Sequence, residues 1–133
     1  SIESMRILID TNICLDILQK RPELYDSSKN ALLLASNKKC NMFITTATVM
    51  DIMYITRKAF QDNNEQKSAV QNFISAFRLL RISKKNINFA FSGAMKDFED
   101  AVQVSLCKES LHAVDSYAEY KRFRQFPGKS DYA

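Results

Sequence analysis

Acidic side chains occupy places in this chain where a buried strand is expected to end or a helix to begin. The run Ile7–Ile9 is apolar and stops at Asp10, and the polar pair Thr11 and Asn12 then opens a helical pattern. A carboxylate at the C-terminal tip of a buried strand lies where open α/β sheets hold their ligands. Its chief chemical use there is to bind a hard metal ion. The alternative is that Asp10 only caps the next helix, since Asp is a good N-cap.

Three further aspartates are candidates for the same site. Asp51 lies among apolar neighbours about one turn into an expected helix, so it either faces inward or a cleft edge, or is a partly exposed acid favoured by the helix dipole. Asp97 and Asp100 are three residues apart and share one face at a helix N-terminus. Capping explains Asp97 well, but it explains Asp100 less well because Ala101 and Val102 beside it indicate a position near the core. Carboxylates that converge on one cleft repel one another unless Mg²⁺ or Mn²⁺ binds between them, and such an ion activates water for attack on a phosphodiester.

The remaining composition excludes several other kinds of site. His112 is the only histidine, which argues against a Ser-His-Asp triad or a multi-histidine zinc site, and there is no Gly-rich phosphate loop. Cys14, Cys40 and Cys107 are far apart in apolar patterns, as expected of reduced thiols in a cytoplasmic protein. We find no signal peptide and no apolar stretch of membrane-spanning length. The net charge of +4 and the paired basic residues suit a polyanionic partner, although solvated surface lysines are the more common explanation.

The elements that must position these acids alternate between strands and helices. Strands are expected at residues 7–9, 42–45 and 79–83, and helices at 13–19, 22–39, 46–60, 65–80, 86–93 and 97–109. The inward-facing positions include Leu34 in the second of these helices, Ile55 in the third, and Phe77 and Leu80 in the fourth. The alternation predicts an α/β fold with a parallel sheet flanked on both faces.

With these motifs the chain resembles a PIN domain, the metal-dependent ribonuclease fold of many bacterial toxin–antitoxin toxins. The matching segments are Ile7–Asn12 with Leu15-Asp16 after it, Ile44–Ile55, and Lys96–Ala101. The resemblance spans about residues 5–107 of what we expect to be a single domain, 1–133, with a divergent tail at 108–133. It implies a three-layer α/β/α fold with a central, mainly parallel sheet.

The resemblance also implies roles for individual residues. The catalytic cluster is Asp10, Asp51 and Asp100, the ligands of Mg²⁺ or Mn²⁺ are Asp10, Asp97 and Asp100, and Asn12 supports them. Asp51 is a shorter-armed departure, because the family commonly has Glu there. The implied function is a toxin-like endoribonuclease that hydrolyses RNA phosphodiesters, with RNA, an antitoxin protein and a second copy of the chain as partners. The alternative is a catalytically degenerate PIN-like domain that binds nucleic acid or another protein.

The C-terminal tail departs from the family. A PIN domain continues into a fourth strand ending in Thr-Arg-Asn or Thr-Arg-Asp, but residues 114–119 make a poor strand here, and Asp115 and Glu119 are weak substitutes for the missing fourth acid. With permitted codons, residues 117–128 read one nucleotide later spell Thr-Arg-Asn-Ile-Lys-Asp-Phe-Gly-Asn-Ser-Pro. Our hypothesis is therefore a change of reading frame between Leu106 and Tyr117. Such a change removes the last strand and one acid, which predicts weak metal binding and reduced or absent nuclease activity.

Overall fold

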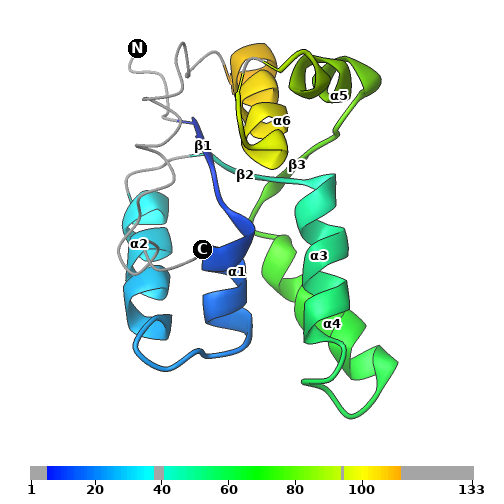
Figure 1. The fold of residues 1–133 in the computed structure, drawn as a ribbon. Coiled ribbons are helices and arrows are strands. Elements are labelled where there is room, and N and C mark those ends of the chain that lie inside the picture. Colours follow the sequence, from blue (N-terminus) through cyan, green and yellow to red (C-terminus); the bar gives the residue numbers. More distant parts are fainter. Residues whose placement is uncertain (1–5, 38–40, 94, 112–133) are drawn as a thin grey trace.

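The computed structural model of the chain describes residues 6–37, 41–93 and 95–111. Asp115 and Glu119, and the proposed change of frame at the tail, lie outside these residues. The elements in chain order are β1 (Arg6–Leu8), α1 (Thr11–Leu18), α2 (Tyr25–Asn37), β2 (Asn41–Thr45), α3 (Thr46–Thr56), α4 (Asn63–Ile74), β3 (Arg78–Leu80), α5 (Lys84–Phe91), α6 (Phe98–Leu106) and the π-helical turn η1 (Cys107–Leu111) (Figure 1).

The three strands form one parallel sheet in the order β1-β2-β3. Ile7 is opposite Met42 in β2, and Ile44 of β2 is opposite Leu79 in β3. The backbone N–H of Ile9 extends the pairing by donating to the carbonyl of Phe43 at 2.8 Å. The parallel α/β arrangement predicted from the sequence is confirmed, and because parallel strands end at one edge, the residues after β1 and β2 are brought to the same edge of the sheet.

Side chains on the two faces of the sheet pack into separate layers. On one face Ile7, Ile9 and Ile44 join a core with residues of α1, α3 and α4, namely Ile13, Cys14, Leu15, Ile52 and Val70. On the other face Leu8 and Phe43 pack against Val104 of α6 and Cys107 of η1. The alternation of strand side chains between these cores follows from the two-residue period of a strand. The result is an α/β/α arrangement with α5 and α6 on one side (Figure 1).

The second predicted helix starts at a different residue than expected, and a different side of it is buried. Pro22 does not open it, because Lys20 and Glu23 take positive φ angles of 47° and 69° and turn the chain before α2 starts at Tyr25. Leu34, predicted to face inward, is exposed. Ser28 and Ala31 lie on the buried side of α2.

The ends of α3 and α4 also correct the predicted elements. We expected α3 to reach residue 60, but it ends at Thr56, where the Thr56 hydroxyl donates to the Ile52 carbonyl and Gln66 Nε2 donates to the Met53 carbonyl, both at 2.7 Å. The bond from Gln66 reaches a carbonyl in the last turn of the helix, where carbonyls lack an intrahelical partner. Likewise α4 ends at Ile74 rather than residue 80, because the segment after Phe77 pairs with β2 as strand β3.

The same structure answers two smaller expectations. Cys14 and Cys107 are buried free thiols, and Cys40 lies outside the described residues. Among the helices described, none has the length and apolar character needed to cross a membrane.

Candidate functional site

Asp10 follows the tip of β1 and is held in the interior, with 8% of its surface exposed. It occupies the N-cap position of α1, with extended φ and ψ of −74° and 148°, and its carbonyl accepts from Ile13 N–H at 3.1 Å. Its side chain, however, makes no capping hydrogen bond to the backbone of α1. Simple capping therefore does not account for the Asp10 carboxylate, which instead lines a cleft.

Asp51 reaches the same cleft from α3. The helix begins at the end of β2, where Thr45 caps it by accepting from Thr48 N–H at 3.1 Å. Asp51 lies on the cleft wall and is exposed, so it does not face inward, and its position fits both a cleft edge and the partly exposed acid that the sequence left open. Ile55, one turn further along, was expected in the core and also lines the cleft, with 40% of its surface exposed.

The first turn of α6 supplies the other acids. Asp97 is the N-cap and its Oδ1 accepts from Asp100 N–H at 2.8 Å, so the predicted capping role is confirmed. Asp97 is exposed, whereas Asp100 is 7% exposed and is buried beside Ala101 and Val102, as the apolar neighbours indicated. Both aspartates line the cleft despite this difference in burial.

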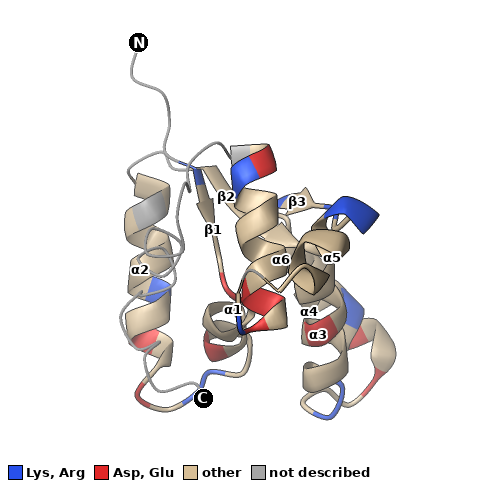
Figure 2. Cartoon of the chain, turned by 45° about the horizontal axis from the view of Figure 1, so that its top comes forward, with Lys and Arg blue, Asp and Glu red and all other residues tan. Residues whose placement is uncertain are grey.

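The cleft lies beside the C-terminal tip of β1, between α1, α3 and the start of α6, and has a volume of about 400 Å³. Figure 2 shows acidic positions at the end of β1 and at the start of α6 meeting beside α1. The residues that line it are Asp10, Thr11, Asn12, Leu15, Asp51, Ile55, Asp97, Glu99, Asp100 and Gln103. The structure thus brings together five of the seven residues singled out from the sequence, and the other two, Asp115 and Glu119, lie outside the described residues.

Glu99 is a member of this group that sequence reasoning missed. Partial burial raises the pKa of its carboxyl, and the negative charges of Asp10, Asp51, Asp97 and Asp100 raise it further. A raised pKa from four neighbouring carboxylates means that their fields overlap within one small volume. The sequence did place Glu99 in the first turn of α6, beside the predicted site. An acid at that position is equally well explained by its favourable interaction with the helix dipole.

The donor set fits a divalent cation. Hard cations such as Mg²⁺ and Mn²⁺ prefer carboxylate oxygens, and Asp10 and Asp100 present two from a largely buried position. Across residues 6–37, 41–93 and 95–111, no group of three or more His, Cys, Asp or Glu side chains is arranged to enclose an ion. Mg²⁺ does not require such a cage, because it keeps several waters and is commonly held by one or two carboxylates.

A second, smaller pocket of about 240 Å³ adjoins the cleft, and it was not foreseen from the sequence. Thr48 lines it, with its hydroxyl 2.9 Å from that of Thr11 and 3.2 Å from that of Thr45. Asp51, Glu99 and Gln103 line both the cleft and this pocket, so the two are continuous. The threonine hydroxyls fix the positions of α1 and α3 relative to each other, and with them the positions of Asp10 and Asp51.

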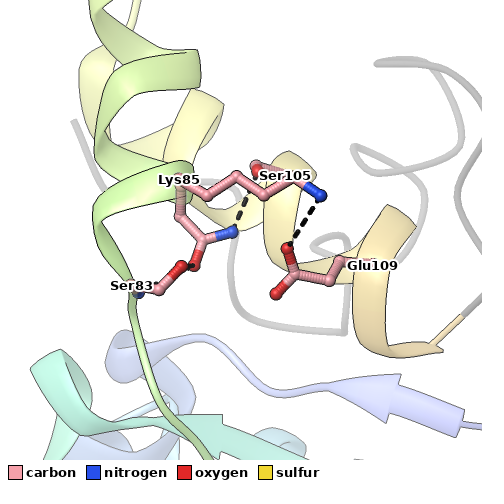
Figure 3. A network of polar contacts seen from close by, with 5 residues as sticks. Ser83, Lys85, Ser105 and Glu109 are labelled. Carbon is pink, nitrogen blue, oxygen red and sulfur yellow. Dashed lines mark hydrogen bonds and ion pairs between the residues drawn. The ribbon is translucent and has the colours of Figure 1, made fainter.

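The position of α6 is fixed from its other side by α5. Asn86, fully buried in α5, donates from Nδ2 to Ser105 Oγ of α6 at 2.9 Å and accepts at Oδ1 from the N–H and hydroxyl of Ser83. At the surface Lys85 forms an ion pair with Glu109 of η1 at 3.8 Å (Figure 3). These contacts hold α6, the helix that carries Asp100, against α5.

Comparison with known proteins places this geometry in a family. The sequence profile described as PIN domain matches residues 6–114. Among solved structures, the chain is similar to one from the crystal structure of VapBC2 from Rickettsia felis bound to a DNA fragment from their promoter, with 22% identity and a TM-score of 0.57 over 77% of this chain and 80% of that chain. At that identity the similarity concerns the fold alone. No curated protein matches the chain significantly in sequence.

Proposed function

The chain belongs to the PIN domain family, and on this premise we propose that it is a toxin-like endoribonuclease that hydrolyses RNA phosphodiesters with Mg²⁺ or Mn²⁺. The observation that carries the proposal is the convergence of carboxylates from the end of β1, from α3 and from α6 on one cleft. Such a cluster is costly unless a cation neutralises it, as the raised pKa of Glu99 indicates. A divalent cation is the simplest partner for this charge.

Within this proposal the side chains have distinct roles. Asp10, Asp97 and Asp100 hold the ion and Asn12 supports them, while Asp10, Asp51 and Asp100 form the catalytic group. When bound, the ion supplies Lewis acidity at the phosphodiester and a more acidic attacking water. The threonine-linked helices keep the carboxylates in place, and basic side chains of the surface seat the RNA backbone.

Further proposals concern partners and place of action. The similar structure is of VapBC2 with promoter DNA, and this supports an antitoxin protein as a partner of the present chain. We also propose that the chain forms a homodimer and acts in the cytoplasm on RNA.

We propose, in addition, that activity is impaired in this chain. The family match ends at residue 114, and the tail from about residue 108 departs from the pattern expected of a PIN domain. The second candidate function is therefore a catalytically degenerate PIN-like domain that binds nucleic acid or protein. It is favoured by the same departure of the tail, because the missing Thr-Arg-Asn or Thr-Arg-Asp ending carries the fourth acid expected of the family.

Titration with Mn²⁺ by calorimetry tests the metal site. The chain should bind Mn²⁺ weakly, and Asp10→Asn or Asp100→Asn should lower the affinity by at least roughly tenfold, since loss of even a supporting group at a metal site has effects of this size. Asp26→Asn is the matched control, because Asp26 is an exposed acid in the first turn of α2. Equal affinity in all four proteins would place Mn²⁺ elsewhere and contradict the proposal.

Repair of the tail tests the impairment. Replacing residues 117–128 with the sequence of the alternative frame should strengthen Mn²⁺ binding and give cleavage of single-stranded RNA that Asp10→Ala abolishes. Robust cleavage by the chain with its present tail, abolished by the same substitution, would show that the activity is intact. Sequencing the gene provides an independent test, since a missing family tail in the +1 frame would end the frame hypothesis.

A further inference from the structure

Three threonine hydroxyls line the smaller pocket beside the cleft, and together they carry one hydrogen more than their mutual contacts use. Thr48 Oγ1 lies 2.9 Å from Thr11 Oγ1 and 3.2 Å from Thr45 Oγ1. Each hydroxyl has one hydrogen to donate, so these two contacts use two of the three hydrogens. In the part of the chain that the structure describes, the three hydroxyls contact no other acceptor. At most 8% of each threonine is exposed, so the remaining hydrogen is a buried donor that calls for an acceptor inside the pocket.

The arrangement of these contacts can leave the remaining hydrogen on Thr11. When Thr45 donates to Thr48 and Thr48 donates to Thr11, the Thr11 hydroxyl is left to donate to a ligand. Of the described threonines, only Thr11 lines both the cleft and the pocket. Successive donations along such a chain polarise the last hydroxyl and strengthen its bond to an acceptor. A ligand oxygen at the boundary between the two cavities therefore meets a donor that is already in place.

The other side chains of the pocket suit a neutral group that both donates and accepts hydrogen bonds. These side chains belong to Ala47, Asp51, Ile82, Glu99, Val102 and Gln103. The carboxylates of Asp51 and Glu99 accept hydrogen bonds and disfavour an anion such as a second phosphate. The described residues that line the pocket include no aromatic ring or Arg on which a nucleobase could stack. A sugar hydroxyl, in contrast, can accept from a threonine and donate to a carboxylate.

We propose that the pocket holds the ribose of a nucleotide next to the phosphate in the cleft, with the Thr11 hydroxyl donating to the 2′-oxygen and Asp51 or Glu99 accepting from the 2′-hydroxyl. The inference rests on the proposed nuclease function and adds the group by which the site distinguishes RNA from DNA. Ribose is bonded directly to the phosphate, and the two cavities share Thr11, Asp51, Glu99 and Gln103, so one nucleotide can occupy both. The volume of about 240 Å³ equals that of roughly eight waters in the liquid and accommodates one sugar ring.

Fluorescence anisotropy with short labelled strands of adenine and cytosine nucleotides tests the ribose site. RNA, 2′-fluoro RNA and DNA of one such sequence carry identical bases and differ only at the 2′ position. We would measure binding to the Asp10→Asn protein in EDTA, so that neither metal nor cleavage affects the affinities. RNA should bind roughly 3- to 10-fold more tightly than DNA, the ratio expected of one hydrogen bond. The 2′-fluoro RNA should bind like DNA, because it keeps an RNA-like sugar shape but has no hydroxyl.

Substitutions in the same background test the site from the protein side. Thr11→Val removes the hydroxyl at nearly constant side-chain size and should remove the preference for RNA, whereas Thr11→Ser should retain it. Ala47→Leu fills the pocket from an exposed position of α3 and should also remove the preference, so the test stands even where Thr11→Val unfolds. Ala59→Leu is the matched control, because Ala59 is exposed and lines neither cavity, and it should leave the preference unchanged.

Several outcomes would overturn the ribose site. Equal affinity of the Asp10→Asn protein for RNA and DNA, or no binding of either strand, would do so. Binding of 2′-fluoro RNA as tight as that of RNA would show that the sugar shape, and not its hydroxyl, is recognised. A preference for RNA that persists in Ala47→Leu would place its origin outside the pocket. Because these measurements contain no metal, they are independent of the Mn²⁺ titration, and failure of the ribose site is distinguishable from failure of the nuclease proposal.

Discussion

Ser28→Ala should destabilise the protein, because it removes a hydrogen bond to the buried carboxylate of Asp16, which lies outside the cleft. The Asp16 side chain is fully buried in α1, accepts from Ser28 Oγ at 2.6 Å and lies 3.6 Å from the guanidinium of Arg21. A hydrogen bond to a charged group contributes about 1.5–3 kcal/mol. For a chain of 133 residues, with an unfolding entropy of about 2.1 cal/mol/K per residue, this corresponds to a fall in Tm of roughly 5–11 °C.

Urea unfolding followed by circular dichroism measures this loss, with an unchanged m-value as the sign that the unfolded state is unaffected. Ser36→Ala, at an exposed serine of the same helix, is the matched control and should change stability by less than about 0.5 kcal/mol. A double-mutant cycle with Asp16→Ala isolates the Ser28–Asp16 interaction. Mn²⁺ affinity should stay the same, because Asp16 does not line the cleft. A loss no larger than that of Ser36→Ala would refute the reasoning.

Two further predictions concern the buried groups that fix α6 and η1. Asn86→Ala should lower the free energy of unfolding, measured in urea, by about 2–4 kcal/mol, because three hydrogen bonds near 2.9 Å are lost and the buried Ser105 hydroxyl loses its donor. Lys85→Ala removes only an exposed ion pair and should lower it by less than about 1 kcal/mol. Equal losses of stability in the two variants would contradict the role of Asn86 in holding α6. Burial raises the pKa of Cys107 to about 12, so between pH 9 and 12 the thiol ionises only in the unfolded chain and stability falls by up to about 1.4 kcal/mol per pH unit. Cys107→Ala should flatten this part of the curve, and an unchanged slope would show that the thiol does not contribute.

The parts of the fold that the sequence predicts well are those set by local periodicity. The apolar run ending at Asp10 predicts a buried strand, and β1 and β2 are found within a residue or two of their expected bounds. The errors occur where a distant group decides the outcome. The end of α3 depends on Gln66, thirteen residues beyond the Met53 carbonyl that it binds. The start of α2 depends on positive φ angles at Lys20 and Glu23, which are not glycines and give no warning in the sequence.

In the site, too, the residues with a local sequence signal were predicted, and the one that depends on distant packing was missed. Asp10, Asp51, Asp97 and Asp100 were foreseen to converge because each follows a strand tip or opens a helix, and all four line the cleft. Their roles as ligands remain a prediction. Glu99 was missed because an acid in a first helical turn has a sufficient local explanation. Only the packing of α6 against the sheet brings it within the field of the aspartates.

Burial alone does not separate a structural acid from a candidate functional one, as the two aspartates of the first helical segment demonstrate. Asp10 and Asp16 are both largely or fully buried. Asp16 is surrounded by groups that stabilise its charge, a serine hydroxyl and a guanidinium. Asp10 instead shares a cleft with other carboxylates and contributes to the raised pKa of both Glu99 and Cys14. The fold gathers negative charge around Asp10 and places a cation beside Asp16, which is why the proposed function puts a divalent ion at the first aspartate and not at the second.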